Sequence, residues 1–513
     1  MSKIWTFLQD RAPLYDDERE ALRVDGRGRT YGRLLDDVAS LAAGLTEIGV
    51  GPGTRFASVV DSSPAAVDAW LATASIGVIE APLNVNYRGR LLANLLQDCD
   101  AEFVLCDERH LPAVRDALAL TELAPRLIVN GTAPAGALAL ADLYRDGSQW
   151  SPTEMDADEG RVILYTSGTT GPSKGVVHNQ AGCLALASYV AEVCGYGTDD
   201  RLLNVFPLYH QNARYTGLLT ALAAGASFDL ESRFSASRFW ALCRERGITA
   251  FNYLGSVLTI IAATSVSAPP PADHGVRVGW GAGATEVNRV QFQELFGIDL
   301  IEVYGLSEAP MATVNLPGSG CAPGSAGRSG RFFEIRVVDA EGRDRPAGEP
   351  GEIVLRPKVP DVFTRGYFRN DAATVAATAD LWFRSGDQGY LNESGDLFFV
   401  DRVKDALRRK GENISAFEVE SVIAAHPDVQ DVAVYGVAAG SGEDEVVAAL
   451  VLTRAVADPT AIIRDVASDL PRYAVPQYIR VLDDLPRTPT LKVQKAVLRS
   501  QGLSADHITI KES

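Results

Sequence analysis

Short apolar runs alternate with amphipathic stretches from residue 54 onward. Runs such as Phe56–Val60 and Phe103–Cys106 have the length and residue types of buried strands, and a helical pattern follows at 109–120. This alternation predicts βα units, in which helices cover a parallel sheet. The pattern returns between residues 161 and 310. Helices are expected there at 181–193, 235–247 and 287–296.

The character of the chain changes after residue 323. Between 323 and 400, Gly and Pro are frequent and short β-branched runs dominate, which predicts a β-rich subdomain with hairpins. From Asp401 on, helical and strand patterns mix, which predicts a compact α+β domain. The expected fold class is therefore α/β, with a large domain of helix-covered sheets over 1–400, a hinge at 401–405 and a small domain over 406–513.

Composition limits the possible partners. A chain of 513 residues with 46% hydrophobic residues is large enough for two or more domains. Its net charge of −18 argues against a nucleic-acid partner, because phosphate backbones are bound through clustered Lys and Arg. Any anionic ligand must therefore meet a local positive site.

Cysteine usage and the N-terminal residues point to the cytoplasm. The six cysteines are scattered without a C-x-x-C pair, as is typical of reduced core thiols. The residues after Met1 lack a cationic stretch followed by an apolar one, so no signal peptide is expected. Charged residues interrupt the longest apolar stretches, so no membrane span is expected.

The most informative segment is a glycine-rich loop at 164–175, which reads LYTSGTTGPSKG and directly follows the expected strand at 161–165. Its glycines allow backbone N–H groups to turn inward, its hydroxyls add donors, and its lysine adds a cation. These features predict a cradle for a polyphosphate. The residues concerned are Thr166, Ser167, Gly168, Thr169, Thr170, Gly171, Ser173, Lys174 and Gly175.

The loop resembles the signature loop of the adenylate-forming superfamily, which contains acyl-CoA synthetases, adenylation domains of peptide synthetases and luciferases. Further family motifs follow in the family's order, so that the resemblance covers about residues 160–500. These motifs are VYGLSE at 303–308, RSGDQGY at 384–390, DRVKD at 401–405 with KGENIS at 410–415, and PRTPTLKVQK at 486–495. The overall pattern is nearest to fatty-acid-type and crotonobetaine/carnitine-type CoA ligases.

The resemblance implies an ATP site with Mg²⁺. In this interpretation Glu308 lies near the triphosphate. A carboxylate and a phosphate can lie close together only with a cation between them, which implies Mg²⁺ bound by Glu308, by phosphate oxygens and by a hydroxyl such as that of Thr166 or Thr169. Tyr304 resembles the residue that stacks on adenine, although a buried core tyrosine is an alternative. Asp387 resembles the carboxylate that binds both ribose hydroxyls, with Arg402 beside it. Further nucleotide positions are Gly283, Ala284, Glu302, Gly305 and Ser307.

Lys492 is expected to carry the first chemical step. A lysine between a carboxylate and the α-phosphate reduces their repulsion and stabilises charge on the transferring phosphoryl group. Leu491 departs from the glycine that many relatives have before this lysine. Lys495 is the competing assignment, and both lysines could instead be surface cations.

The resemblance also implies that the small domain rotates. Lys404 occupies the hinge position, and Gly411 lies where the thiol of CoA would pass through a narrow tunnel. His210, in the segment FPLYH at 206–210, resembles the gate of the acyl site. The small residues expected along the acyl pocket leave volume, which favours a medium-to-large or bulky hydrophobic acid. They are Gly255, Gly281, Gly283, Ala284 and Ala309, next to Met311.

The expected activity is therefore an acid–thiol ligase of the AMP-forming acyl-CoA synthetase type. It uses ATP, Mg²⁺ and CoA with a small-molecule carboxylic acid, and the chain is expected as a monomer or homodimer. An enzyme that adenylates the acid and delivers it to an acyl-carrier protein or a separate thioesterifying partner has the same ATP motifs and remains open.

Overall fold

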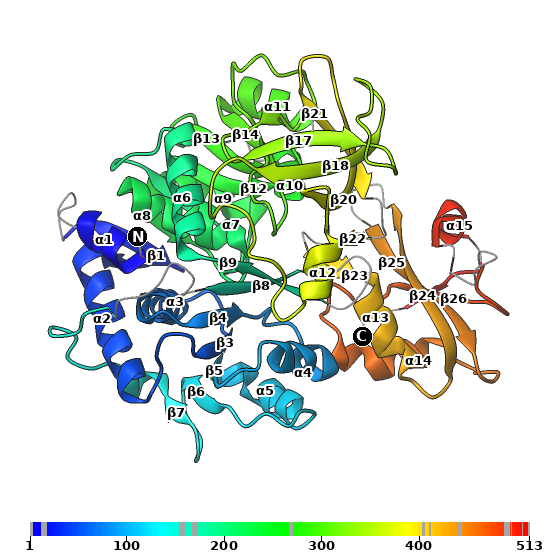
Figure 1. The fold of residues 1–513 in the computed structure, drawn as a ribbon, viewed down its shortest axis with the longest axis horizontal. Coiled ribbons are helices and arrows are strands. Elements are labelled where there is room, and N and C mark those ends of the chain that lie inside the picture. Colours follow the sequence, from blue (N-terminus) through cyan, green and yellow to red (C-terminus); the bar gives the residue numbers. More distant parts are fainter. Residues whose placement is uncertain are drawn as a thin grey trace.

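In the computed structural model, the large domain contains two sheets that are mostly parallel, as the alternation of strands and helices predicts (Figure 1). The structure describes residues 4–11, 18–152, 161–166, 173–265, 270–284, 286–402, 406–409, 412–438, 444–486, 493, 495–504 and 506–510. None of the helices within these ranges is long and apolar enough to cross a membrane.

The first sheet has the strand order β7-β6-β5-β3-β4-β8-β9, parallel except for the β8–β9 pair. Its strands are β3 (Arg55–Val59), β4 (Ile79–Pro82), β5 (Phe103–Asp107), β6 (Arg126–Asn130), β7 (Leu138–Ala139), β8 (Val162–Thr166) and β9 (Lys174–His178). The helices that follow its strands are α3 (Pro64–Ile76), α4 (Gly89–Asp98) and α5 (Leu111–Leu118).

The second sheet has the order β16-β15-β14-β13-β12-β10-β11-β1-β2 and is parallel from β1 to β14. Its strands are β1 (Glu20–Val24), β2 (Arg27–Thr30), β10 (Arg201–Asn204), β11 (Ser227–Leu230), β12 (Ala250–Leu254), β13 (Val278–Ala282), β14 (Asp299–Tyr304), β15 (Thr313–Asn315) and β16 (Arg328–Ser329). The helices of this half are α6 (Gln180–Cys194), α7 (Gln211–Ala213), a π-helix (Arg214–Leu219), α8 (Thr220–Ala224), α9 (Ala236–Arg246), α10 (Gly255–Ser265) and α11 (Glu286–Phe296).

Local sequence chemistry sets the helix ends. At α3, the Ser63 hydroxyl accepts a hydrogen bond from the backbone N–H of Ala66, and Pro64 opens the helix. Gly77 ends it with φ of +94°, a left-handed conformation that glycine adopts without a steric penalty. Near the N-terminus, α1 (Ile4–Arg11) packs beside α3, α6 and α8, and α3 packs on α2 (Tyr31–Glu47) (Figure 1).

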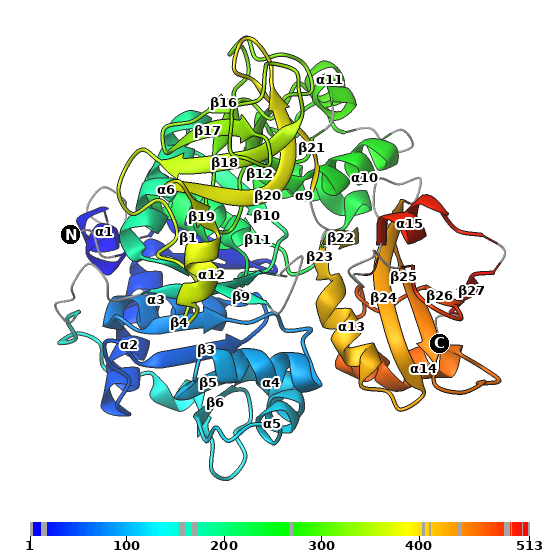
Figure 2. The ribbon, with the colours of Figure 1, turned by 45° about the vertical axis from the view of Figure 1, so that its right-hand side comes forward.

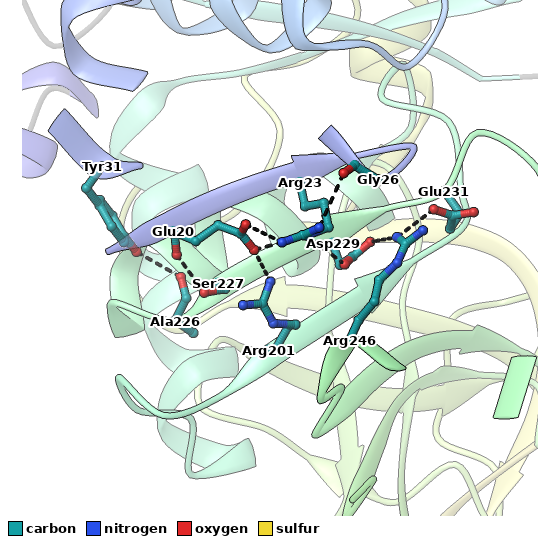
Figure 3. A network of polar contacts seen from close by, with 10 residues as sticks. All are labelled: Glu20, Arg23, Gly26, Tyr31, Arg201, Ala226, Ser227, Asp229, Glu231 and Arg246. Carbon is teal, nitrogen blue, oxygen red and sulfur yellow. Dashed lines mark hydrogen bonds and ion pairs between the residues drawn. The ribbon is translucent and has the colours of Figure 1, made fainter. Parts of the chain in front are cut away.

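A network of arginines and carboxylates fastens the far edge of the second sheet, on β1, β10 and β11 (Figure 3). Arg201 and Arg23 both pair with Glu20, the latter at 2.5 Å. Arg246 pairs with the fully buried Asp229 at 2.5 Å and with Glu231 at 2.7 Å. Each carboxylate of this network therefore has an arginine partner.

The expected β-rich subdomain is confirmed as an antiparallel sheet. It consists of β17 (Phe333–Val338), β18 (Gly351–Pro357), β19 (Thr378–Ala379), β20 (Trp382–Leu391) and β21 (Leu397–Arg402), with α12 (Asp371–Ala376) beside it. In this sheet Asp387 of β20 lies opposite Arg402 of β21.

The small α+β domain lies beside the large one as a separate lobe (Figure 2). Its elements are β22 (Ala406–Arg409), β23 (Glu412–Ser415), α13 (Ala416–Ala424), β24 (Val429–Ala438), β25 (Asp444–Leu452), α14 (Thr460–Val466), β26 (Tyr478–Val481), α15 (Lys495–Ser500) and β27 (Ile508–Thr509). Leu91 of α4 is part of its hydrophobic core, and the amide of Asn84 donates to the hydroxyl of Tyr473 at 2.8 Å. The two domains are therefore in direct contact along α4.

Candidate functional site

The carboxyl ends of β12, β13 and β14 meet at one edge of the second sheet, where ligands bind in open α/β sheets. β14 ends at Tyr304, β13 at Ala282 and β12 at Leu254. The family motif at 303–308 thus begins where the strand ends, beside Gly283 and Ala284. The sequence spacing alone could not show this proximity, which the parallel pairing of the strands creates.

Glu302 organises this edge. Its carboxylate accepts hydrogen bonds from the backbone N–H of Gly283 at 2.5 Å and of Ala284 at 3.0 Å. The hydroxyl of Tyr253 donates to the same carboxylate at 2.8 Å. Burial raises the pKa of Glu302 to about 7, although these donors lower it. Glu302, Gly283 and Ala284, three of the positions expected at the nucleotide, therefore form one hydrogen-bonded unit.

Tyr304 and Asp387 are brought together across 83 residues of chain, since the tyrosine hydroxyl donates to Asp387 at 2.9 Å. Both side chains are buried, with relative exposures of 8% and 4%. Tyr304 is also part of the main hydrophobic core, which agrees with the alternative of a buried core tyrosine. This bond joins the expected adenine residue to the expected ribose residue.

Glu308 belongs to a second cluster, on the side where the sequence places the phosphates. Its carboxylate accepts from the hydroxyl of Tyr367 at 2.8 Å, and the ammonium of Lys174 lies 4.8 Å from the centre of the Tyr367 ring. Lys174 opens β9 directly opposite Thr166, the last residue of β8. The structure thus connects Lys174, at one described end of the glycine-rich loop, to Glu308 through Tyr367, with Thr166 opposite Lys174. Sequence reasoning missed Tyr367, because its contacts come from a segment far along the chain.

The neighbouring residues of the motif have structural roles. The backbone carbonyl of Ser307 lies 2.6 Å from Nε2 of the buried His178, which donates to it, and burial lowers the pKa of His178 to about 4. At Gly305 a Cβ would lie 2.4 Å from the backbone nitrogen of Met311. This approach explains why a glycine follows Tyr304.

The structure corrects the interpretation of two pocket glycines. A Cβ on Gly255 would lie 1.9 Å from the carbonyl oxygen of Gly283, and one on Gly281 would lie 2.2 Å from that of Tyr253. Backbone atoms already fill these spaces, so the two glycines allow strands and loops to approach and leave no volume for a substrate. Ala309 and Met311 are likewise buried in the core, whereas Gly283 is exposed and Ala284 half-buried.

His210 faces the small domain. Its Nε2 lies 3.2 Å from the carboxylate of Glu412, and its ring is 4.6 Å from that of Tyr209. Burial raises the pKa of Glu412, but the hydrogen bond and charge of His210 outweigh burial and hold the pKa below its ordinary value. Glu412, which sequence reasoning did not single out, directly follows Gly411. The hairpin of β22 and β23 therefore lies against the expected acyl gate.

Several expected residues lie outside the described residues, namely Ser167, Gly168, Thr169, Thr170, Gly171, Lys404, Gly411 and Lys492. Arg402 is described by its backbone position opposite Asp387. Lys495, the competitor of Lys492, pairs with Glu420 at 2.6 Å inside the small domain. An internal ion pair of this kind makes Lys495 the weaker candidate for a catalytic cation.

Comparison with known proteins identifies the class. The family described as AMP-binding enzyme matches residues 8–368, and the AMP-binding enzyme C-terminal domain matches residues 418–492. The chain belongs to the AMP-binding enzymes, and its sequence-based assignment to the adenylate-forming superfamily is confirmed.

The relatives are CoA ligases. Crotonobetaine/carnitine–CoA ligase of Escherichia coli O139:H28 is 28% identical, over 92% of this chain and 93% of its own. The enzyme of the same description from Salmonella typhimurium LT2 is also 28% identical, over 96% and 97%. The solved structure of o-succinylbenzoate CoA synthetase from Bacillus subtilis has a TM-score of 0.83 at 25% identity, over 96% of this chain and 98% of its own. These proteins agree with the placement of the chain among AMP-forming acyl-CoA synthetases.

An amide bond synthetase from Marinactinospora thermotolerans has the same fold. Its TM-score is 0.85 at 24% identity, over 98% of this chain and 99% of its own. The expected fold class is confirmed by these structures.

Proposed function

We propose that the protein activates a carboxylic acid in two steps. A carboxylate oxygen of the acid attacks the α-phosphate of ATP, which gives acyl-adenylate and releases pyrophosphate. The thiol of CoA then attacks the acyl carbon, so that acyl-CoA forms and AMP leaves. The observation that carries this proposal is the convergence at the end of β14 of the Tyr304–Asp387 bond and the Glu308–Tyr367–Lys174 cluster.

The residues around Glu308 fit a magnesium ion. Mg²⁺ prefers oxygen ligands and is commonly bound through one or two carboxylates together with phosphate oxygens. Glu308 offers a carboxylate whose hydrogen-bond donor among the described residues is the neutral hydroxyl of Tyr367. Together with the hydroxyl of Thr166 it would hold the ion, which would neutralise charge on the phosphates of ATP. Lys174 would add a second positive charge on the same side.

We assign the other nucleotide contacts as the family resemblance implies them. Tyr304 packs against the adenine, while Asp387 and Arg402 bind the ribose. Glu302 fixes the backbone of Gly283 and Ala284 beside them. The loop residues Ser167, Gly168, Thr169, Thr170 and Gly171 surround the phosphates, with Gly305 and Ser307 nearby. Lys492 supplies the cation for adenylation.

The position of the small domain supports the second step. The contact between His210 and Glu412 holds the β22–β23 hairpin on the acyl gate, and Glu412 directly follows Gly411 in the sequence. We assign to Gly411 the passage of the pantetheine arm and to Lys404 the hinge about which the small domain turns. His210 then lies beside the acyl end of the substrate.

The proposed acid is medium-to-large, or bulky and hydrophobic. Gly283 and Ala284 support this size, because they present no large side chain at the open end of β13. We further propose a cytoplasmic enzyme, in agreement with the unpaired state of all six cysteines. It acts as a monomer or homodimer.

Delivery of the acyl group to a carrier protein is the second candidate, because it uses the same nucleotide site. The test is pyrophosphate release over a panel of carboxylic acids, followed by product analysis with and without CoA. Acid-dependent pyrophosphate release and acyl-CoA formation are expected. Pyrophosphate release without any acyl-CoA would favour the carrier protein, and no release with any acid would contradict adenylation.

Gly411→Leu separates the two steps within one chain. The side chain should obstruct the thiol without reaching ATP, so acid-dependent pyrophosphate exchange should stay near the wild-type rate while thioester formation falls by about a hundredfold or more. Gly502→Leu, at an exposed loop of the small domain, is unsuitable as a control because its φ is +60°. Gly197, which has open space at its Cβ and no positive φ, provides the matched control as Gly197→Leu. An equal loss of both steps in Gly411→Leu would show that the tunnel assignment is wrong.

A further inference from the structure

Three asparagines form a hydrogen-bonded cluster directly behind the acyl gate. Asn204 ends β10, Asn252 lies within β12, and Asn212 is the second residue of α7, two positions after His210. Asn204 and Asn252 are buried, with exposures of 1% and 2%, whereas Asn212 is half-buried. The cluster therefore lies between the sheet and the α7–π-helix segment, with one member reaching accessible space.

The hydrogen bonds fix how each amide is oriented. The oxygen of Asn204 accepts from the backbone N–H of Phe206 at 2.8 Å, so its nitrogen must be the atom that faces Asn212, at 3.1 Å. The nitrogen of Asn252 lies 3.1 Å from the carbonyl oxygen of Thr216, which can only accept, so it too is a donor toward Asn212. It approaches Oδ1 of Asn212 at 2.9 Å.

Asn212 therefore uses its amide oxygen twice and keeps its NH₂ group for another partner. No acceptor for this nitrogen is found among the residues that the structure describes, and the nitrogen is not among the fully buried atoms that lack a partner. An amide held by its oxygen in this way presents two N–H donors in a fixed direction.

The segment that carries Asn212 is anchored on both sides. The guanidinium of Arg214, fully buried, makes two hydrogen bonds to the carboxylate of Glu80, at 2.7 and 2.6 Å. The amide of Gln211 lies 3.5 Å from the carbonyl oxygen of Leu306, within the family motif that follows Tyr304. Arg214 also begins the π-helix, an element that is frequent at functional sites. Asn212 is thus rigidly placed between the acyl gate and the nucleotide edge.

We propose that Asn212 determines which acids the enzyme accepts, by donating a hydrogen bond from Nδ2 to an acceptor on the acyl part of the substrate. The inference rests on the proposed function and narrows it. The substrate class is a bulky acid that carries an oxygen or nitrogen acceptor, such as a carbonyl or ether oxygen, at a fixed distance from its carboxylate. An alkyl acid without such an acceptor would exclude water from the Asn212 amide but would not accept a hydrogen bond from it.

The physical basis is the asymmetry of hydrogen bonding at buried sites. A site built to donate to a substrate group discriminates strongly against the analogue that lacks it, because the protein donor is then left unpaired. For one neutral amide donor, a preference of about tenfold in kcat/KM is expected.

The experiment compares pairs of acids that share a carbon skeleton and differ only in one methylene replaced by a carbonyl or an ether oxygen. The pairs place the oxygen at successive distances from the carboxylate, and pyrophosphate release gives kcat/KM for each acid. The wild-type enzyme should prefer the oxygen-bearing member by about tenfold at one distance. Equal rates or an alkyl preference at every distance would overturn the inference while leaving adenylation intact.

Two variants test the residue. Asn212→Asp keeps an oxygen for Asn204 and Asn252 but replaces the NH₂ group by an acceptor, so the preference should disappear or reverse. Asn212→Ser removes the amide without adding charge and should reduce the preference to about one. Asn94→Asp, at an exposed position of α4, is the control for the added charge and should keep the wild-type preference. The KM for ATP is measured for every variant.

A purely structural role for Asn212 predicts a different result. It would lower the rates with both members of a pair equally, and thus leave their ratio at the wild-type value, which would overturn the inference. Absence of pyrophosphate release with every acid in the wild-type enzyme would instead overturn the proposed function, and this inference with it.

Discussion

Two sets of carboxylates at opposite ends of the second sheet have different partners. At the far edge, Glu20, Asp229 and Glu231 are each paired with arginine (Figure 3). At the candidate site, Glu302 and Glu308 receive hydrogen bonds, among the described residues, from backbone N–H groups and tyrosine hydroxyls. The first set is neutralised within the protein. In the second set, burial raises the pKa of Glu302 to about 7, so its carboxyl group fixes the backbone of Gly283 and Ala284, whereas Glu308 has no arginine partner among the described residues and is the carboxylate offered to a ligand.

This difference distinguishes carboxylates that stabilise the fold from carboxylates at the candidate site, without reference to any sequence motif. A carboxylate that pairs with arginine contributes to the fold, whereas one held only by neutral donors is oriented but electrically uncompensated. At the site, the compensating charges are expected to come from Mg²⁺ and from the small domain. Changes in the two sets should therefore affect different quantities.

The largest effect is expected from Lys492, the cation that we assign to the small domain. Removal of a preorganised charged donor costs about 2.7–4 kcal/mol of transition-state stabilisation, so Lys492→Ala should slow acyl-adenylate formation by about a hundred- to a thousandfold. The same variant should convert pre-made acyl-adenylate and CoA to thioester at a near-normal rate. Single-turnover measurements of each step provide the check.

Lys495→Ala is the matched control. Because Lys495 pairs with Glu420 within the small domain, its loss should change either step little. Normal adenylation by Lys492→Ala, or a large loss of adenylation in Lys495→Ala, would move the catalytic assignment by three residues.

Removal of the charge of Glu308 should change the magnesium dependence of the reaction. Glu308→Gln keeps an acceptor for the Tyr367 hydroxyl but removes the charge, so it should lower the rate by about tenfold or more and raise the Mg²⁺ concentration needed for half-maximal activity. The measurement is a magnesium titration of pyrophosphate release. An unchanged magnesium dependence would remove Glu308 from the proposed metal site. Thermal stability should stay near the wild-type value.

The smallest effect is expected for Asp229, and it should appear in the pH dependence of the free energy of unfolding. Burial raises the pKa of Asp229 from 3.8 to about 6, although Arg246 lowers it, so the folded chain binds this proton more tightly than the unfolded chain. Its contribution to the free energy of unfolding is therefore greatest below about pH 4 and falls as the pH rises toward 6. Between pH 5 and 7 the loss is about 1 kcal/mol.

Asp229→Asn should remove this part of the pH dependence. Urea unfolding at pH 5 and at pH 7 would show the variant gaining about 1 kcal/mol relative to wild type as the pH rises. The KM for ATP should not change, because Asp229 lies away from the site. A constant difference between variant and wild type at the two pH values would contradict the raised pKa.

Much of this arrangement could be predicted from the sequence. The alternating pattern predicted the helices at 181–193, 235–247 and 287–296, and the structure has them as α6, α9 and α11 within about one residue at most ends. The family motifs also singled out Tyr304, Asp387 and Glu308, whose roles stay predictions; the structure brings Asp387 of β20 into hydrogen-bond contact with Tyr304 at the end of β14, and Glu308 follows four residues later. The spacing of residues along the sequence predicts a helix or a loop because the residues of such an element are contiguous in the chain.

The partners of those residues could not be predicted, because they come from distant segments. Tyr367 reaches Glu308 across 59 residues, and Glu412 reaches His210 across 202. The hairpin of β22 and β23 was not expected either, since the sequence there suggested only a hinge and a loop. One usable signal was overlooked, namely a lone asparagine within each of the apolar strands 201–204 and 250–254. A polar side chain within such a run indicates a buried hydrogen-bond partner.

The close approach of the backbone at Gly255 to Gly283, and at Gly281 to Tyr253, has a consequence for redesign. Attempts to reshape the specificity of this enzyme by substituting these glycines would fail as folding defects, because any added atom meets main chain at about 2 Å. A saturation library would therefore score both glycines as intolerant for a structural reason, the close backbone contact, and not for a catalytic one. Redesign of specificity is better directed at Gln211 and Asn212 of α7, whose side chains are only half-buried.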